Sequence, residues 1–548
     1  MTLNIAAVVD AVAAALPDRE ALISKDGRLT YAQLQDQAWR LANFLLSQGI
    51  TVHTERPTLK NWEIGQDPVA LYMLNCPEYI IGQMGAYGAR AIPFNVNYRY
   101  VGEELRYLFN DARPRAILYH GQFAETLAGV LPQLDSVELL IQVDDGSGAA
   151  LLPGAIDFNT ALAGSSAEKP AITLSNDDIY CVYTGGTTGM PKGVLWRQED
   201  SLIANLGGAD ASGAPLPDLD AFVARAQRSD GNRVLPASPF MHGAGSQTSL
   251  AAWCRGNTVV IQNSVERLDP ADLLTVVQHE KVNMMLLVGD AFGRPVAKAA
   301  REGCYDLGSV KVVYNTGAVM SPPVKAALLE ALPNARIVDA FGSTETGPQA
   351  LTISDRCDES RNKPKSFGVG TGTLVLSEDK TQVLAPGHDG FGWIAKKGRV
   401  PLGYLGDEAR TRETFPEVDG ERLVVGGDRV RLLKNGEIEF HGRDSFTINS
   451  GGEKIFAEEV ELALKQHSGV ADVVVTGRPS EQWGSEVVAI IQMEDGASCD
   501  RQALLDEAAR HVARYKLPKA FLFLDRIQRH PNGKTDNRWA QSVAGGAS

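Results

Sequence analysis

The sequence predicts an α/β protein: a large N-terminal domain of layered, mostly parallel sheets covered by helices, followed by a small mobile C-terminal α+β domain. Three observations lead to this prediction. Short β-branched runs alternate with helical patterns, 548 residues exceed the size of one compact core, and the pattern changes near residue 440. Strands that alternate with helices generally form parallel sheets covered on both faces.

An amphipathic helix is expected at the N-terminus. Apolar residues recur there at the spacing of one helical face, at positions 5, 8, 9, 12 and 16. The segment lacks a basic start and carries Asp10 in its middle, so it predicts a helix packed on the body rather than a signal peptide. Further along, β-branched runs predict strands at residues 117–119, 139–143, 259–262, 284–288, 310–314 and 336–338.

Two polar stretches that contain proline, residues 51–67 and 207–218, are expected to be loops or insertions. Later in the chain, residues 430–433 and 438–441 flank an Asn-Gly turn, which predicts a β-hairpin. The remainder has its own alternation of strands and helices. We therefore expect a large domain over residues 1–442, a hinge at 443–445 and a small lid domain over 446–548.

The overall composition is that of an ordinary globular protein, with 44% hydrophobic and 22% charged residues. A formal net charge of -14 argues against nucleic acid as the main partner and against a basic membrane-binding face. The six cysteines form no Cys-x-x-Cys pair, and no apolar run approaches the length that crosses a bilayer. These features predict a soluble, cytoplasmic protein.

Residues 183–193 carry the most specific local signal and read YTGGTTGMPKG. Glycines let backbone N–H groups approach phosphate oxygens, while threonine hydroxyls and Lys192 supply further donors. In a Walker A loop, a Ser or Thr that ligates magnesium follows the lysine, but here Pro191 precedes it and Gly193 follows it. The segment therefore predicts a phosphate-binding loop of a different kind, the alternative being a surface Gly/Thr loop without function.

Five further segments occur in a fixed order. Residues 340–346 read AFGSTET, 427–428 read GD, 442–444 read GRD, 450–454 read SGGEK and 531–534 read PNGK. Together with the phosphate loop, this ordered set resembles the adenylate-forming superfamily of acyl-CoA synthetases, luciferases and peptide-synthetase adenylation domains. The resemblance covers nearly the whole chain. It implies that a carboxylate attacks the α-phosphorus of ATP, giving an acyl-adenylate and pyrophosphate, before a thiol takes the acyl group.

The resemblance also implies a role for each matched position. The phosphates would be bound by Thr184, Gly185, Gly186, Thr187, Thr188 and Lys192. Glu345 would ligate Mg²⁺ while Thr344 reaches a phosphate oxygen. The ribose would be held by Asp428 and Arg443, and the adenine by Gly317, Ala318, Asp339, Phe341 and Gly342. A lone carboxylate is usually a solvated surface charge, but its place in the ordered set favours function.

Three other positions are assigned by the same resemblance. Lys534 is expected to bridge the carboxylate and the α-phosphate during adenylation and then to withdraw as the small domain rotates. The path of coenzyme A would be lined by Gly451, Gly452 and Lys454, although a solvated lysine is the alternative for the last. His242 would lie beside the acyl carboxylate, where a gate is favoured over a base.

We therefore expect an enzyme, an AMP-forming acid–CoA ligase that uses ATP, Mg²⁺ and coenzyme A. Residues 95–100, 196–200 and 449–456 look most like the bacterial branch that activates steroid side-chain acids and other long or branched acids. Two alternatives stay open: transfer to a carrier-protein pantetheine, and a catalytically silent nucleotide-binding module. The oligomeric state is also open, with a homodimer among the alternatives.

Overall fold

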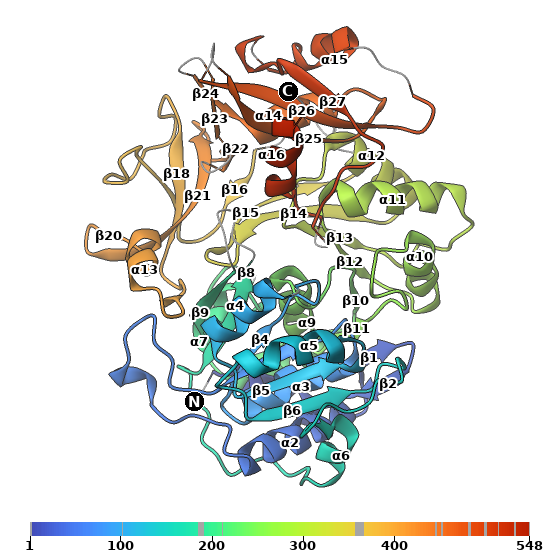
Figure 1. Ribbon diagram of the computed structural model, residues 1–548, viewed down its shortest axis with the longest axis vertical. Coiled ribbons are helices and arrows are strands. Elements are labelled where there is room, and N and C mark those ends of the chain that lie inside the picture. The colour runs from blue at the N-terminus through green and yellow to red at the C-terminus, as the bar shows by residue number, and fades with distance from the viewer. Residues whose placement is uncertain are drawn as a thin grey trace.

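The computed structural model describes residues 3–546 apart from residues 101, 185–190, 211, 357–365, 444–446, 451–452, 481–483, 498–500, 513 and 531–532. Sheets and helices of the large domain occupy the lower and middle parts of Figure 1, and the C-terminal segments lie above them. The predicted fold class is confirmed. The mobility of the small domain stays a prediction.

The N-terminal part contains a wholly parallel five-stranded sheet in the order β4-β3-β5-β6-β7. Its strands are β3 (Pro68–Tyr72), β4 (Ile92–Asn95), β5 (Ala116–His120), β6 (Leu139–Val143) and β7 (Ile156–Asp157). The associated helices are α2 (Tyr31–Ser47), α3 (Pro77–Gly88), α4 (Glu103–Ala112), α5 (Ala124–Val130) and α6 (Phe158–Ala163). Helices α4 and α5 pack on one face and α2 and α3 on the other, which explains why β3, β5 and β6 are buried along their whole length.

The largest sheet has nine strands in the order β16-β15-β14-β13-β12-β10-β11-β1-β2, and the pairs from β14 to β1 are parallel. Its strands are β1 (Glu20–Ser24), β2 (Gly27–Thr30), β10 (Arg233–Pro236), β11 (Thr258–Val260), β12 (Met284–Leu287), β13 (Val312–Thr316), β14 (Arg336–Ser343), β15 (Gly347–Ser354) and β16 (Gly368–Val369). Three helices, α10 (Pro270–His279), α11 (Gly289–Glu302) and α12 (Pro322–Ala331), cover one face.

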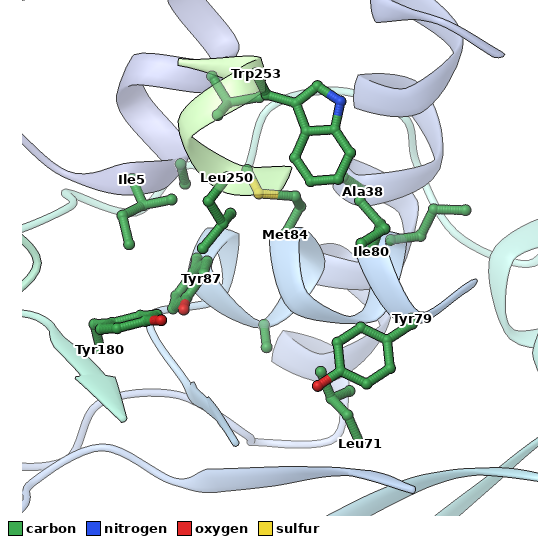
Figure 2. Packing of buried hydrophobic residues seen from close by; sticks show 14 of the residues in the cluster. Ile5, Ala38, Leu71, Tyr79, Ile80, Met84, Tyr87, Tyr180, Leu250 and Trp253 are labelled. Carbon is green, nitrogen blue, oxygen red and sulfur yellow. The ribbon is translucent and has the colours of Figure 1, made fainter. Parts of the chain in front are cut away.

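On the other face of this sheet lie α1 (Ile5–Ala15), α8 (Leu219–Arg228) and α9 (Gly243–Trp253), while α7 (Gln198–Ala204) packs against α1, β8 (Ile179–Thr184) and β9 (Lys192–Arg197). Helix α9 brings Leu250 and Trp253 against α3, where Met84 and Tyr87 fill the space between the two sheets (Figure 2). Burial of such large side chains stabilises the layered arrangement. Each fully buried large apolar side chain contributes about 1.5–3 kcal/mol relative to an exposed one.

Two smaller antiparallel sheets complete the large domain. One contains β8 (Ile179–Thr184), β9 (Lys192–Arg197) and β19 (Gly403–Tyr404). The other contains β17 (Thr373–Leu376), β18 (Gly392–Lys397), β20 (Glu417–Val418), β21 (Glu421–Leu432) and β22 (Ile438–Arg443). Helix α13 (Glu408–Thr414) follows β19, and short 3₁₀ turns occur at Arg56–Thr58, Gly121–Phe123, Leu131–Gln133 and Arg514–Lys516.

The C-terminal part has its own core. A hairpin of β23 (Thr447–Ser450) and β24 (Glu453–Phe456) precedes a sheet of β25 (Val470–Ser480), β26 (Gly484–Met493) and β27 (Ala520–Phe523). Its helices are α14 (Ala457–Leu464), α15 (Arg501–Ala508) and α16 (Asn537–Gly546). One face of β25 and β26 forms a cluster with α14 and α15, and Val474 and Ile490 of the other face pack with Ala540 of α16, as expected of an independent α+β domain.

The local predictions agree with these elements. Helix α1 buries Ile5, Val8, Val9 and Val12 on one face, and all six predicted strands are present. The predicted hairpin is β21–β22, and Gly436 has φ +84 in its turn, a conformation that disfavours a side chain. The exact domain bounds stay a prediction, because Asp444 and Ser445 of the expected hinge lie outside the described residues.

Residues 51–67 are anchored by ion pairs, and Ile64 packs against the apolar cluster of the five-stranded sheet. Glu55 contacts the Arg90 guanidinium at 2.8 Å, and Arg90 contacts Asp178 at 2.8 Å. Asp67 contacts Arg115 at 2.9 Å. Among the helices that the structure describes, none combines the length and apolar character that a membrane crossing requires. The cytoplasmic location stays a prediction.

Candidate active site

The candidate site lies where several parallel strands of the nine-stranded sheet end. Gly317 and Ala318 directly follow β13, and Thr344 and Glu345 directly follow β14. Ligands of open α/β sheets bind at the carboxyl ends of the strands, because the loops that follow adjacent strands meet there. The topology alone therefore brings together two of the predicted motifs.

The phosphate side is built on the hairpin β8–β9. Thr184 ends β8 and pairs directly with Lys192 at the start of β9. The segment between them, which includes Gly185, Gly186, Thr187 and Thr188, lies outside the described residues. The predicted threonine and lysine donors at its two ends therefore lie side by side at the loop end of one hairpin.

Tyr404, a residue that the sequence analysis did not identify, connects Glu345 to this hairpin. The Tyr404 hydroxyl donates a hydrogen bond to Glu345 Oε1 at 3.1 Å, and Lys192 Nζ lies 5.7 Å from the centroid of the Tyr404 ring. Tyr404 is positioned by β19, which pairs with β9. No local signal identifies Tyr404, because its partners lie far away in sequence.

The turn that carries Thr344 and Glu345 is held firmly. The Trp196 indole N–H donates to the Thr344 carbonyl at 3.0 Å, and the Ser343 backbone N–H donates to Thr346 Oγ1 at 3.0 Å. Thr344 Oγ1 lies 3.6 Å from the position that a Cβ on Gly243 would take. Thr344 therefore faces the beginning of α9, beside His242.

The donor set around Glu345 fits Mg²⁺. A half-buried carboxylate oriented by a tyrosine hydroxyl is a hard oxygen ligand of the type that this cation prefers. Within the described residues, no group of three or more His, Cys, Asp or Glu side chains could hold a metal ion. An ion held by Glu345 would therefore take its remaining ligands from phosphates and water, as Mg²⁺ commonly does.

Asp428 lies beside the same turn. It is 3% exposed on β21, and its backbone pairs directly with Arg443 on β22. A Cβ on Gly426 would lie 3.6 Å from Asp428 Oδ2 and 3.5 Å from Thr346 Cγ2, so these side chains line a common space. The backbone pairing places both predicted ribose contacts on one hairpin. The Arg443 side chain is not among the described parts.

The predicted adenine residues surround the ends of β13 and β14. Gly317 has φ +84, and Phe341 packs against the Phe440 ring with centroids 4.9 Å apart. A Cβ on Gly342 would lie 2.2 Å from the Gly347 carbonyl oxygen, so no other residue fits there. Ala318 packs closely against Gly289, at the start of α11.

Asp339 has partners that the sequence did not indicate. Its buried carboxylate accepts a hydrogen bond from Asn315 Nδ2 at 2.8 Å and forms an ion pair with Lys325 Nζ at 2.7 Å. The predicted contact with the adenine amino group stays a prediction. The observed contacts give Asp339 a structural role in joining β13, β14 and α12.

Lys534 reaches this site from the C-terminal domain. It lies in a tight turn in which the His530 N–H donates to the Lys534 carbonyl at 2.9 Å, and Gly533 packs on Ala291 and Phe292 of α11. Lys534 Cε lies 3.9 Å from the position that a Cβ on Gly317 would take. Although Lys534 is exposed, its side chain therefore lies against the adenine-side loop of the large domain.

His242 is the N-cap residue of α9 and is half-buried, and its Nε2 is inaccessible to solvent. Burial lowers its pKa to about 3, and the nearby positive charges of Lys534, His530 and Arg99 act in the same direction. Among the described residues, its Nε2 has no hydrogen-bond partner. A neutral imidazole of such low basicity is a poor proton acceptor, which favours the interpretation as a gate over that as a base.

We expect the His242 ring to stay neutral from pH 8 down to pH 5 in the folded enzyme. An unperturbed histidine has a pKa of about 6.5 and would titrate within that range. The measurement is an NMR titration of histidine ring signals, with His242 assigned from the spectrum of His242→Asn. The urea-unfolded chain is the control, and a His242 midpoint above pH 5 in the folded protein would contradict the expectation.

The remaining predicted residues concern coenzyme A. Gly451 and Gly452 lie outside the described residues, and the Lys454 backbone forms part of β24 while its side chain is not described. Their roles stay predictions.

Comparison with known proteins agrees with this arrangement. The sequence profile of AMP-binding enzymes matches residues 9–405, and that of the AMP-binding enzyme C-terminal domain matches residues 459–534. This chain belongs to the AMP-binding enzyme family and is an enzyme of the adenylate-forming fold.

Individual relatives match over almost the full length. The chain is 48% identical to the medium-chain acyl-CoA ligase Mig of Mycobacterium avium, over 99% of this chain and 98% of that protein. It is 36% identical to a 3-oxocholest-4-en-26-oate–CoA ligase of Rhodococcus rhodochrous, over 100% and 96%. In structure it matches an anthranilate CoA ligase in complex with anthranoyl-AMP, with a TM-score of 0.81 and 20% identity over 99% and 98% of the two chains.

Proposed function

We propose that this chain is an ATP-dependent carboxylic acid–CoA ligase, which forms an acyl-adenylate and pyrophosphate and then acyl-CoA and AMP. The observation that carries the proposal is the position of Lys534, which comes from the C-terminal domain and lies against Gly317 at the end of β13. Glu345 and Lys192 lie around the same edge, which thus combines a cation for the reacting groups with a magnesium ligand and phosphate donors.

In the first half-reaction, two anions have to approach each other. Lys192 and Thr184 would hold the outer phosphates and Asp428 the ribose, while Lys534 would neutralise the acid carboxylate and the α-phosphate as the bond forms. Glu345 would hold Mg²⁺, which supplies charge neutralisation at the phosphates, and Thr344 would reach a phosphate oxygen. Fixed donors of this kind stabilise developing charge without a reorganisation cost at the moment of reaction.

In the second half-reaction, a thiol has to reach the acyl carbonyl. Lys534 and its turn occupy the approach beside Gly317 in the observed arrangement. The C-terminal domain would therefore rotate about residues 443–445 and remove Lys534 before coenzyme A attacks. Neutral His242 beside Thr344 would shield the adenylate from water during this exchange.

The acid is expected to be medium- to long-chain, branched or a steroid side-chain acid, because an apolar sheet face runs outward from the site. Cross-strand partners Thr316, Ala340 and Leu351 form the row nearest the site, followed by Tyr314, Val338 and Ile353. Leu351 is 48% exposed and Ile353 is 52% exposed. Successive rows lie about 7 Å apart along the strands, so together they present an extended apolar surface.

The position of this face ties it to the substrate. Its opposite side is buried under α11 and α12 through Val313 and Ile337, whereas α9 packs over β10, β11 and β12 on the same side as the apolar face. The first row directly precedes Gly317 and Phe341, next to the predicted carboxylate position. An apolar tail attached to that carboxylate would thus lie along the face. The names of the relatives point to acids of the same kind.

We expect Leu351→Asp to lower kcat/KM about tenfold for a long-chain or steroid side-chain acid. The kcat/KM for butyrate is expected to stay nearly unchanged. A charge in the tail path removes apolar contact only from acids long enough to reach it. The measurement is acid-dependent AMP release in the presence of coenzyme A. Val383→Asp is the control, because Val383 is similarly exposed, at 54%, outside this face. Equal losses for butyrate and the long acid would contradict this path.

A second candidate acceptor is the pantetheine of a carrier protein. A panel of short fatty, long fatty, aromatic and steroid acids distinguishes the two, assayed for ATP–pyrophosphate exchange and for CoA-dependent thioester. Exchange with at least one acid, together with thioester formation, supports the ligase. Exchange without thioester for any acid favours the carrier protein. The absence of exchange for every acid would favour a silent nucleotide-binding module.

A further inference from the structure

A buried ion pair joins the two domains next to the candidate site. Asp290 lies in the first turn of α11 in the large domain, and Lys465 directly follows α14 in the C-terminal domain. Asp290 Oδ2 and Lys465 Nζ are 3.2 Å apart, and their side chains are only 6% and 9% exposed. A pair this deeply buried between two domains is costly to separate, because each charge then needs a new partner or water.

The ion pair continues toward the Lys534 turn through two further charged side chains. Lys465 Nζ lies 3.5 Å from Asp472 Oδ1, and Arg529 donates to the Asp472 carboxylate from Nε at 2.5 Å and from Nη2 at 2.7 Å. Arg529 Nη1 then donates to the Gly533 carbonyl at 3.3 Å and to Thr535 Oγ1 at 3.1 Å. The residues on both sides of Lys534 are thus held by this chain of contacts.

In the large domain the same chain ends at the adenine-side loop. Asp290 Oδ1 accepts a hydrogen bond from the Ser321 N–H at 2.7 Å, at the start of α12. The neighbouring Gly289 packs directly on Ala318, where an added Cβ would lie 2.7 Å from the Ala318 Cβ. Asp290 therefore contacts the segment that follows Gly317 as well as the domain that carries Lys534.

The electrostatic environment favours the charged forms of Lys465 and Asp472. Nearby carboxylates outweigh burial and raise the pKa of Lys465, and Lys465 and Arg529 outweigh burial and lower the pKa of Asp472. A second interdomain contact, between Arg294 Nη1 and Glu494 Oε1 at 3.2 Å, lies on the same side of α11. Both of these interdomain ion pairs therefore involve one helix of the large domain, α11.

We propose that Asp290 and Lys465 form an interdomain latch that positions Lys534 for adenylation and has to break before thioester formation. The inference rests on the proposed two-step function. Asp290 and Lys465 are positioning residues, since they act through Arg529 and the Lys534 turn. The latch sets the relative populations of the adenylation and thioester-forming arrangements of the domains. Its removal therefore changes the ratio of the two half-reaction rates and does not abolish both.

The test uses Lys465→Met and Asp290→Asn, which remove one charge each and nearly keep side-chain size. Adenylation is measured as single-turnover pyrophosphate release, and thioester formation as acyl-CoA made from supplied acyl-adenylate and coenzyme A. We expect adenylation to fall about tenfold to a hundredfold in either variant, because Lys534 is less precisely placed. Thioester formation is expected to stay equal or to rise. The double variant is expected to lose no more than the worse single variant.

Glu486→Gln is the matched control. Glu486 forms an ion pair with Arg478 at 2.6 Å, with side chains 19% and 20% exposed, but both residues lie in the β25–β26 hairpin of one domain. We expect this variant to keep the wild-type ratio of the two half-reaction rates. Equal loss of both half-reactions in Lys465→Met, or no change in their ratio, would overturn the latch. Failure of the proposed function is distinguishable, because the wild-type enzyme would then lack thioester formation with coenzyme A, or both half-reactions.

Discussion

Lys534→Ala is expected to slow adenylation about a hundredfold or more while sparing thioester formation from supplied acyl-adenylate. The reason is positional: Lys534 Cε lies beside Gly317 although the lysine belongs to the other domain, so its charge serves the arrangement in which the two anions meet. The two half-reactions are measured separately, by single-turnover pyrophosphate release and by acyl-CoA formation.

Lys519→Ala is the control for this substitution. Lys519 is also an exposed lysine of the C-terminal domain, and it directly precedes β27 rather than lying in the Lys534 turn. We expect this variant to retain both half-reactions. If Lys534→Ala reduced both half-reactions to the same extent, the lysine would not act specifically in adenylation, and the account of its withdrawal would be wrong.

Glu345→Gln is expected to lower the adenylation rate about a hundredfold to a thousandfold at millimolar Mg²⁺. The amide keeps the shape of the side chain and can still accept the hydrogen bond from Tyr404, but it lacks the charge that would hold the cation. The measurement is pyrophosphate release as a function of Mg²⁺ concentration, where a higher requirement for Mg²⁺ should accompany the lower rate.

Tyr404→Phe separates orientation from charge at the same carboxylate. It removes the 3.1 Å hydrogen bond to Glu345 Oε1 but leaves both the carboxylate charge and the ring beside Lys192. A smaller loss, of about tenfold, is expected because one hydrogen bond to a charged group contributes about 1.5 kcal/mol at the lower end of its range. Wild-type adenylation by Glu345→Gln at every Mg²⁺ concentration would rule out the proposed role of Glu345.

Several parts of the fold were predictable because their signals are local. The spacing of Ile5, Val8, Val9 and Val12 predicts the buried face of α1. The Asn-Gly turn predicts the β21–β22 hairpin. The motifs also indicated which residue types should meet. The structure places Thr184 opposite Lys192 and Asp428 opposite Arg443, as direct cross-strand pairs. These cross-strand pairs can be predicted once the β8–β9 and β21–β22 hairpins are assigned.

Other features depend on contacts between distant segments and had no sequence signal. Tyr404 reaches Glu345 only because β19 pairs with β9, and Asp339 meets Lys325 only because α12 packs against β14. The stretch at residues 51–67 looked like an unexplained insertion, yet Glu55 and Asp67 tie it to arginines from other segments. Periodicity and turn residues cannot report such charge pairs, since partners are chosen by the tertiary fold.

The sequence by itself determined the class of this protein, the order of its elements and the chemical groups available for activating a carboxylate. Only the tertiary structure decided that Lys534 lies against Gly317, that Asp290 and Lys465 are buried across the domain boundary, and that an apolar sheet face leads away from the site. The physical reason is that secondary structure and motif chemistry follow from neighbouring residues, whereas burial and ion pairing depend on which surfaces the packed domains bring together.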